Sequence, residues 1–563
     1  MNIDKNTREF IKGSASISIT IVITKIMGVL YKVPLSYILG DEGMGYFNSA
    51  YAIYGFLYIL CASGVPKAIT LSLAENVYVN NKADAYSMVR AGVGLFIKVG
   101  FVITTLNIIC APALVNLIGS KKSIYTIISI APSIIFVSVS GVLRGCMNYY
   151  NRLSKIAAAQ LIEAALKLIL GLALAYIGAH LHLELSMISA LCILGITLGS
   201  IVSCIYLYVA FNNMFIGEKT GQSVSSHREI LKKSLYKIAL PISLGAALLN
   251  IGGVIDLGVI MNKLVELGVT ETEANAIYGN YTTLAIPMLN LVIAVISPIV
   301  LAFLPILAKM SLNGDKVGFG DSVRRMLCIN NAIAIPASVV FYLYAFEVLD
   351  VLFSVSSAAV GAQLLSTLSL GVWLLSLVTV LNTALEAKGK IKLTVFSLLI
   401  GSVAKIVGNY CLLGRFGIVG APISTVISYA ISAIISLVGF YNSGAGVRII
   451  RICLVDFFSA FLCFSPMYFI IYTQGGFSCG LISAFVSVLL SCIFYYLILC
   501  LRFFRIEDAR KMWNMHKKIA EDWIYIRICI KAYENNVFLL KLHLKFAILI
   551  KDIIFLYERK FLK

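Results

Sequence analysis

Charged residues are scarce in this sequence. Aspartate, glutamate, lysine and arginine together make up 13% of its 563 residues, whereas an ordinary soluble domain has about 25%. Hydrophobic residues make up 60%, more than a soluble core can bury but no obstacle in the hydrocarbon interior of a bilayer. The composition therefore excludes a soluble globular protein and predicts an all-α protein that crosses a membrane many times.

Catalytic and metal-binding motifs are also missing from the sequence. The five histidines do not lie beside a metal-like set of ligands or a nucleophile, and the thirteen cysteines include no CxxC pair. No GxxxxGK[ST] phosphate-binding loop is present. We therefore expect no enzymatic activity, no cofactor and no metal site. The net charge of +19 does not indicate a nucleic-acid partner, because the basic residues fall in loops between apolar runs.

Apolar segments recur along the chain and are long enough to cross a bilayer as helices. A transmembrane helix needs about 17–25 such residues, and we predict about fourteen spans. Their approximate ranges are 14–39, 48–72, 89–112, 124–143, 156–179, 185–211, 238–261, 282–308, 327–346, 358–385, 391–413, 421–441, 452–473 and 479–501.

Lysine and arginine concentrate in alternate loops between these spans. If the N-terminus is cytoplasmic, the inner loops hold basic groups such as Lys388, Lys390 and Lys392, whereas the outer loops hold few, for example Lys263 and Arg415. Such an excess of basic residues is typical of cytoplasmic loops. The pattern predicts a multi-pass plasma-membrane protein with both termini in the cytoplasm.

The longest inner loop lies near the middle of the spans and indicates two six-helix lobes. We predict an N-terminal lobe at 1–211, a cytoplasmic linker at 212–237, a C-terminal lobe at 238–441, two additional spans at 442–502 and a basic amphipathic tail at 503–563. A basic amphipathic helix binds the inner membrane surface through anionic lipids, which are therefore predicted partners of the tail.

The first predicted span carries one polar stripe. Ser14, Ser18, Lys25, Lys32 and Ser36 follow one another at intervals of four, seven, seven and four residues, which places them on one face of a helix. A lysine inside the bilayer is costly unless it faces protein or water, and two of them suit an anion such as pyrophosphate. We predict that Lys25 and Lys32 bind substrate; the alternative for Lys32 is snorkelling to the interface.

Isolated charges occur in three further spans. Lys67 follows a proline in the second span and is either a substrate ligand or a snorkelling or paired lysine. Glu163 and Lys167 are four residues apart, a spacing that predicts a mutually neutralising pair. Asp256 needs a lysine, a cation or a proton as its partner. For Asp256 and Glu163, both ion or proton coupling and structural pairing stay open.

Two later spans carry polar faces. Thr283, Asn290 and Ser297 recur every seven residues among prolines, which fits a bending helix that lines a cavity; hydrogen bonding between helices is the alternative. Lys405 and Asn409 share a face of the eleventh span. We predict Asn290 and Lys405 as further substrate-binding residues.

Several segments resemble a known family. They are TKIMGVLYKVPL at 24–35, LGDEGMG at 39–45, AYAIY at 50–54, SGVP at 63–66 and LAE at 73–75, with weaker similarity at 255–256, 278–279 and 285–291. These segments closely resemble the stage V sporulation protein B group of polysaccharide-transport proteins. That group belongs to the multidrug/oligosaccharidyl-lipid/polysaccharide exporter superfamily, which includes the lipid II flippases. The resemblance covers roughly residues 10–505.

The resemblance implies two six-helix lobes around a central cavity, two extra helices and a flippase that exposes the cavity alternately to each side. The implied substrate is a polyprenyl-pyrophosphate-linked sugar, such as a lipid II-like precursor of peptidoglycan, spore cortex or another polysaccharide. In relatives a cationic position on the first helix binds the head group, and Lys25 occupies such a position. Two departures are Tyr31, where lipid II flippases typically have an arginine, and Lys67 directly after Pro66.

Three other functions remain as alternatives. A cation-coupled drug or metabolite antiporter of the same superfamily would need a coupling carboxylate such as Asp256. A membrane polysaccharide polymerase or glycosyltransferase would need charged residues on an ample outer loop, for which residues 262–281 are the candidate. A morphogenetic scaffold would have no transport activity.

Overall fold

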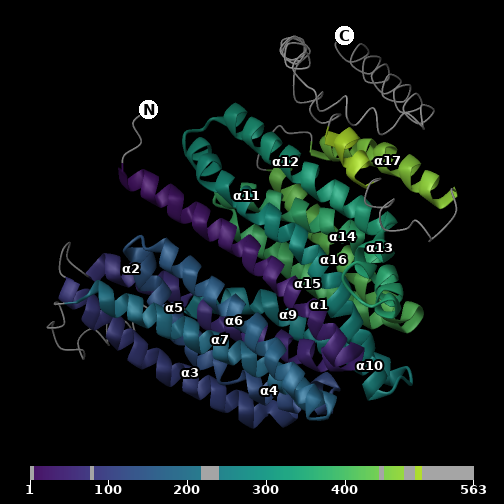
Figure 1. Ribbon diagram of the computed structural model, residues 1–563. Coiled ribbons are helices and arrows are strands. Elements are labelled where there is room, and N and C mark those ends of the chain that lie inside the picture. The colour runs from purple at the N-terminus through teal and green to yellow at the C-terminus, as the bar shows by residue number, and fades with distance from the viewer. Residues whose placement is uncertain (1–4, 77–81, 217–239, 443–448, 474–487, 497–563) are drawn as a thin grey trace, which may run out of the picture. The chain divides into compact units, whose positions relative to one another are not determined.

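The fold is described from a computed structural model, which covers residues 5–76, 82–216, 240–442, 449–473 and 488–496 (Figure 1). Within these ranges the regular secondary structure is helical, which confirms the predicted all-α class. The first helices are α1 (Lys5–Ala62), α2 (Val65–Asn76), α3 (Lys82–Ile118), η1 (Lys121–Ser123), α4 (Ile124–Ile130), α5 (Ser133–Tyr149), α6 (Leu153–His180) and α7 (Leu185–Met214).

A second series of helices follows the linker region. It comprises α9 (Leu240–Glu266), α10 (Glu271–Asn280), the π-helical turn η3 (Tyr281–Ala285), α11 (Ile286–Leu312), α12 (Lys316–Leu343), α13 (Ala345–Asp350), α14 (Val355–Ala387), α15 (Ile391–Phe416), η4 (Gly417–Val419), α16 (Gly420–Tyr441) and α17 (Ile449–Thr473).

Nine helical segments in the described ranges are long and apolar enough to cross a membrane. The two longest, Val22–Glu75 and Ile391–Tyr441, each hold two of the predicted spans. Helices α9 and α17 coincide with two more, and much of the last predicted span, 479–501, lies outside the described residues. The chain is a multi-pass membrane protein, while the count of about fourteen spans stays a prediction.

Two glycines reverse the chain inside the longest segments. Gly40 lies within α1 at φ 61° and ψ −175°, and Gly417 follows α15 at φ 57°. A side chain would strain the backbone in this region of φ, so glycine is required. The rings of Tyr31 and Phe47 lie 5.9 Å apart, which shows that the parts of α1 before and after Gly40 run antiparallel.

Helices α6 and α7 approach each other at the level of their backbones. A Cβ atom on Gly195 would collide with Gly171, and one on Gly199 would lie 2.9 Å from the carbonyl oxygen of Glu163. Small residues permit such close packing between membrane helices. The close contact fixes α6, and with it the charged side chains of α6, against the rest of the bundle.

In the part of the chain that the structure describes, buried side chains form three clusters, one of which joins the two series of helices. One cluster lies within the first series and includes Phe211, and a second lies within the second series and includes Phe440. The third combines Leu35 of α1 with Leu257 of α9 and Leu368 of α14. Helix α1, purple in Figure 1, contacts α6 and α7 as well as α9, α10 and α11. Helix α1 therefore connects the two series.

The predicted domain boundaries are not tested by this arrangement. Residues 217–239, most of the predicted linker, lie outside the described part of the chain, as do the residues of the predicted tail. The lobe limits at 211, 238 and 441 therefore stay predictions.

Candidate functional site

The lysines of the polar stripe lie on α1, and Lys32 contacts protein atoms. Lys32 Nζ donates hydrogen bonds of 2.9 Å to Asn48 Oδ1 and of 2.9 Å to the carbonyl oxygen of Thr282. Asn48 Nδ2 donates in turn to Thr283 Oγ1 at 2.8 Å. Lys32 thus reaches protein acceptors instead of the membrane interface. Because both of its partners are neutral, its positive charge is not cancelled by a carboxylate.

Lys25 lies seven residues before Lys32 on the same helix, with an exposed side chain. Its ammonium group acts electrostatically on Tyr51, in the second half of α1. In the described part of the chain Lys25 forms no salt bridge. The side chains of Ser14 and Ser18, the first members of the predicted stripe, lie outside the description.

The prediction that Glu163 pairs with Lys167 is wrong. Glu163 Oε2 lies 3.2 Å from Arg144 Nη2, and Arg144 Nη1 also donates to the Tyr58 hydroxyl at 3.0 Å. The guanidinium group of α5 offers several donors to a carboxylate, and it occupies the place that sequence spacing assigned to the lysine. Glu163 therefore holds α6 to α5, and Lys167 is available for other contacts.

Lys167 faces the tyrosines of α1. Its Nζ lies 4.4 Å from the centroid of the Tyr51 ring and 5.3 Å from that of Tyr31, and it donates a hydrogen bond of 3.3 Å to the Tyr51 hydroxyl. A cation over an aromatic face is attracted by the ring quadrupole. We call Lys25, Lys32, Lys167, Tyr31 and Tyr51 the lysine–tyrosine cluster.

A row of aromatic rings extends from this cluster along α1. Phe47, Tyr51, Tyr54 and Tyr58 have successive ring centroids 5.9, 5.9 and 5.6 Å apart. Their spacing of four, three and four residues is a helical-face pattern that is visible in the sequence. Our sequence interpretation missed both this row and the role of Lys167, although the row itself was readable from its period.

Lys405 and Asp256, which the sequence assigned to different roles, bind each other. Lys405 Nζ lies 2.7 Å from Asp256 Oδ2, and Asn409 Nδ2 donates to Asp256 Oδ1. The pair joins α15 to α9. The lysine partner that Asp256 needs is therefore Lys405 and not Lys25, and Lys405 and Asn409 occupy both carboxylate oxygens.

Within the described ranges, two other predicted ligands form no hydrogen bond with the residues of the lysine–tyrosine cluster. Lys67, near the start of α2, and Asn290, on α11, are both exposed. Lys67 acts electrostatically on Glu386, near the end of α14. The structure thus connects Lys32 with Lys167, and Lys167 and Lys25 with Tyr51, but it gives no contact that adds Lys67, Asn290 or Lys405 to them.

The two series of helices also meet at the turn of α1. Asp41 accepts hydrogen bonds from Asn280 Nδ2 at 3.0 Å and from Ser357 Oγ at 3.1 Å. A Cβ atom on Gly279 would lie 2.8 Å from Gly45 N and closer still to the Asp41 carbonyl oxygen. The glycines in the two motif segments are therefore needed for backbone contact between α1 and α10.

Residues 35–495 of the chain match a family model for the lipid II flippase MurJ. The chain belongs to this family. Stage V sporulation protein B of Bacillus subtilis (strain 168) is 21% identical over 427 residues, which cover 74% of this chain and 80% of the relative. Lipid II flippase MurJ of the same strain is 20% identical over 450 residues, which cover 75% and 81%. The resemblance to the stage V sporulation protein B group is confirmed.

Solved structures share the fold of this family member. A lipid II flippase MurJ in an inward closed conformation gives a TM-score of 0.65 at 16% identity and covers 86% of this chain and 98% of its own. An inward-facing multidrug resistance MATE family transporter of the MOP superfamily gives 0.62 at 14% identity and covers 78% and 98%. At these identities the likeness establishes the fold alone.

Proposed function

We propose that this chain is a flippase that moves a polyprenyl-pyrophosphate-linked, lipid II-like cell-wall or polysaccharide precursor outward across the plasma membrane by alternating access. Membership of the lipid II flippase MurJ family supports this class of activity. The name of the relative stage V sporulation protein B supports a role in sporulation, and we propose spore cortex or peptidoglycan assembly as the process served. Both termini are proposed to be cytoplasmic, on the strength of the charge bias of the loops.

The lysine–tyrosine cluster is the observation that carries this proposal. In it Lys32 interacts with Lys167, and both Lys167 and Lys25 interact with Tyr51, without a carboxylate partner for these lysines among the described residues. Uncompensated cations inside a membrane protein are costly unless water or an anion is present. A pyrophosphate head group supplies that anion, since it can accept hydrogen bonds from more than one lysine.

Each member of the cluster has a proposed role. Lys25, the exposed lysine, binds the pyrophosphate directly, and Lys167 binds it from α6. Lys32 holds α1 against η3 and adds positive potential. Tyr51 presents both an apolar ring and a hydroxyl group, a combination that suits a sugar. Lys67 and Asn290 remain proposed contacts to the more distant parts of the substrate.

The ion pair of Lys405 and Asp256 supports a structural role for these two residues. An antiporter would need Asp256 to exchange a cation or proton, yet both carboxylate oxygens accept hydrogen bonds from neighbouring side chains. Buried pairs of this kind stabilise the arrangement of helices as long as both partners are present. The coupling role is therefore not part of our proposal.

Reconstituted flipping with matched lipids tests the function. Proteoliposomes that contain the full-length protein should translocate a fluorescent lipid II-type pyrophosphate faster than the same polyprenyl lipid with a single phosphate. Lys25→Ala should remove this preference, and Lys98→Ala, which changes an exposed lysine of α3, should not. Equal transport of both lipids, or gradient-driven export of a cationic drug without lipid flipping, would refute the proposal.

A further inference from the structure

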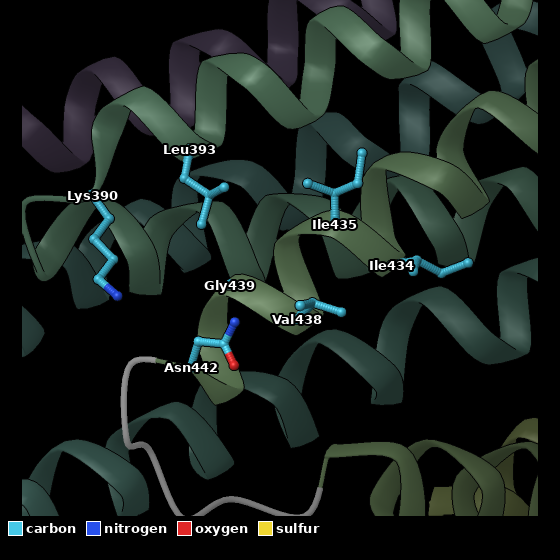
Figure 2. Close-up of a pocket in the computed structure, with 7 residues that line it drawn as sticks. All are labelled: Lys390, Leu393, Ile434, Ile435, Val438, Gly439 and Asn442. Atoms are coloured by element: carbon cyan, nitrogen blue, oxygen red, sulfur yellow. The ribbon is translucent and has the colours of Figure 1, made fainter.

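A groove lies between the start of α15 and the end of α16, well separated in sequence from the cluster on α1. Its volume is about 380 Å³, and its lining includes Lys390, Leu393, Ile434, Val438 and Asn442. Figure 2 shows the Lys390 ammonium and the Asn442 carboxamide toward one end, with Val438 and Ile434 toward the other. The groove thus has a polar end and an apolar end.

The apolar end is open to the surroundings of the protein. Ile434 is 59% exposed and Val438 53% exposed, and the two side chains lie one turn apart on α16. Leu393 packs so closely on Gly439 that a Cβ atom there would collide with it. Gly439 therefore lets α15 and α16 meet at the floor of the groove. The exposed branched side chains form a surface that suits a hydrocarbon chain.

The polar end carries an excess of positive charge. Lys388 and Lys390 lie in the connection between α14 and α15, and Lys392 lies in the first turn of α15. Burial and the neighbouring charges of Lys390 and Lys316 lower the pKa of Lys388. The nearby carboxylate of Glu386, at the end of α14, interacts electrostatically with Lys67. Lys390 and Asn442 are both exposed at helix ends, where a membrane protein meets the head groups.

We propose that this groove binds one anionic phospholipid, with its phosphate at Lys390 and Asn442 and an acyl chain over Ile434 and Val438. A lysine binds phosphate as a point charge, and the carboxamide of Asn442 supplies a further donor. The order of the groups matches a lipid in the bilayer, because the polar pair sits at the helix ends and the apolar pair lies one to two turns deeper along α16. Basic residues at a membrane surface attract anionic lipids in this way.

Native mass spectrometry of the full-length protein, titrated with phosphatidylglycerol or phosphatidylcholine, tests the site. We expect tighter binding of phosphatidylglycerol, weakened about fivefold by Lys390→Gln, the effect of one lysine at a membrane surface. Lys390→Arg should retain the preference. Lys392→Gln is the matched control, because Lys392, in the first turn of α15, is also exposed but does not line the groove.

A second pair of variants tests the acyl-chain half of the site. Val438→Trp should fill the groove and weaken the binding of both lipids, whereas Ile427→Trp, at a position of α16 that is 41% exposed and outside the groove, should not. Ile434→Trp makes the same test if Val438→Trp does not fold. Equal effects of Lys390→Gln and Lys392→Gln would overturn the proposal, as would unchanged lipid binding in the folded tryptophan variant.

Discussion

Lys32 and Lys405 are two lysines of membrane helices that meet very different partners. Lys405 contacts a carboxylate at 2.7 Å, and a second side chain, Asn409, occupies the other oxygen of that carboxylate. Lys32 contacts a carboxamide and a carbonyl oxygen, so no carboxylate partners it, and Lys167 lies close enough to act on it electrostatically. The comparison shows that two lysines of membrane helices can differ in their partners, and we propose that this difference separates a structural ion pair from a site that attracts an anion.

Asp256→Ala tests the ion pair of Lys405 and should have the largest effect on stability. It leaves the Lys405 ammonium group without its counter-charge, a change that typically costs about 3–5 kcal/mol for a buried pair. We expect a clearly lower melting temperature in detergent. Asp256→Ala combined with Lys405→Met should recover most of the loss. If Asp256→Ala melts like the wild type but does not transport, Asp256 is a coupling group and the comparison fails.

Gly279→Ala tests the close approach of α10 to α1, which brings the helices around Lys32 together. The added methyl group would collide with the backbone near Asp41, and overpacking of this kind typically costs about 1–3 kcal/mol. The melting temperature should therefore fall. Gly94→Ala on α3 is the matched control, since nothing lies within 4 Å of its Cβ position. An unchanged melting temperature for Gly279→Ala would show that the two helices are not in backbone contact.

Variants of Tyr51 test how much the aromatic ring beside Lys167 contributes to flipping. Tyr51→Leu removes the ring under Lys167, and a loss of about 1 kcal/mol of cation–π interaction should slow flipping about fivefold. Tyr51→Phe keeps the ring and should have a smaller effect. Tyr342→Leu, at an exposed tyrosine of α12, serves as the control. If Tyr51→Phe is as slow as Tyr51→Leu, the hydroxyl group and not the ring carries the contribution.

Deletion of residues 520–563 should have the smallest effect of all. The composition of this tail predicts a peripheral helix on the inner membrane surface. Flipping in proteoliposomes should stay close to the full-length rate. Loss of flipping by a truncated protein that still expresses and melts normally would give the tail a direct part in transport.

Local periodicity predicted much of the fold and part of the site. The hydropathy pattern located the long apolar helices of the described ranges, and the seven-residue interval placed Lys25 and Lys32 on one helix face. The same kind of period, in Phe47, Tyr51 and Tyr54, was present but was not interpreted. These features depend on one helix at a time, so a single sequence contains them.

Contacts between distant helices could not be predicted in the same way. Lys405 and Asp256 are 149 residues apart, and no local pattern joins them. The pairing of Glu163 with Lys167 failed because Arg144 of another helix competes for the same carboxylate. Tertiary packing decides which of several possible partners a charged group meets, and helical spacing alone leaves that choice open.

The most direct test of the central claim compares Lys25→Gln with Lys405→Gln. The flipping rate and the melting temperature of each variant are measured in the same preparations. We predict that Lys25→Gln melts like the wild type but flips about tenfold more slowly or worse, because a charged hydrogen bond to the substrate is lost. Lys25→Arg should keep much of the activity, and Lys405→Gln should lose stability. A Lys25→Gln protein that flips the pyrophosphate-linked lipid at the wild-type rate would contradict the account.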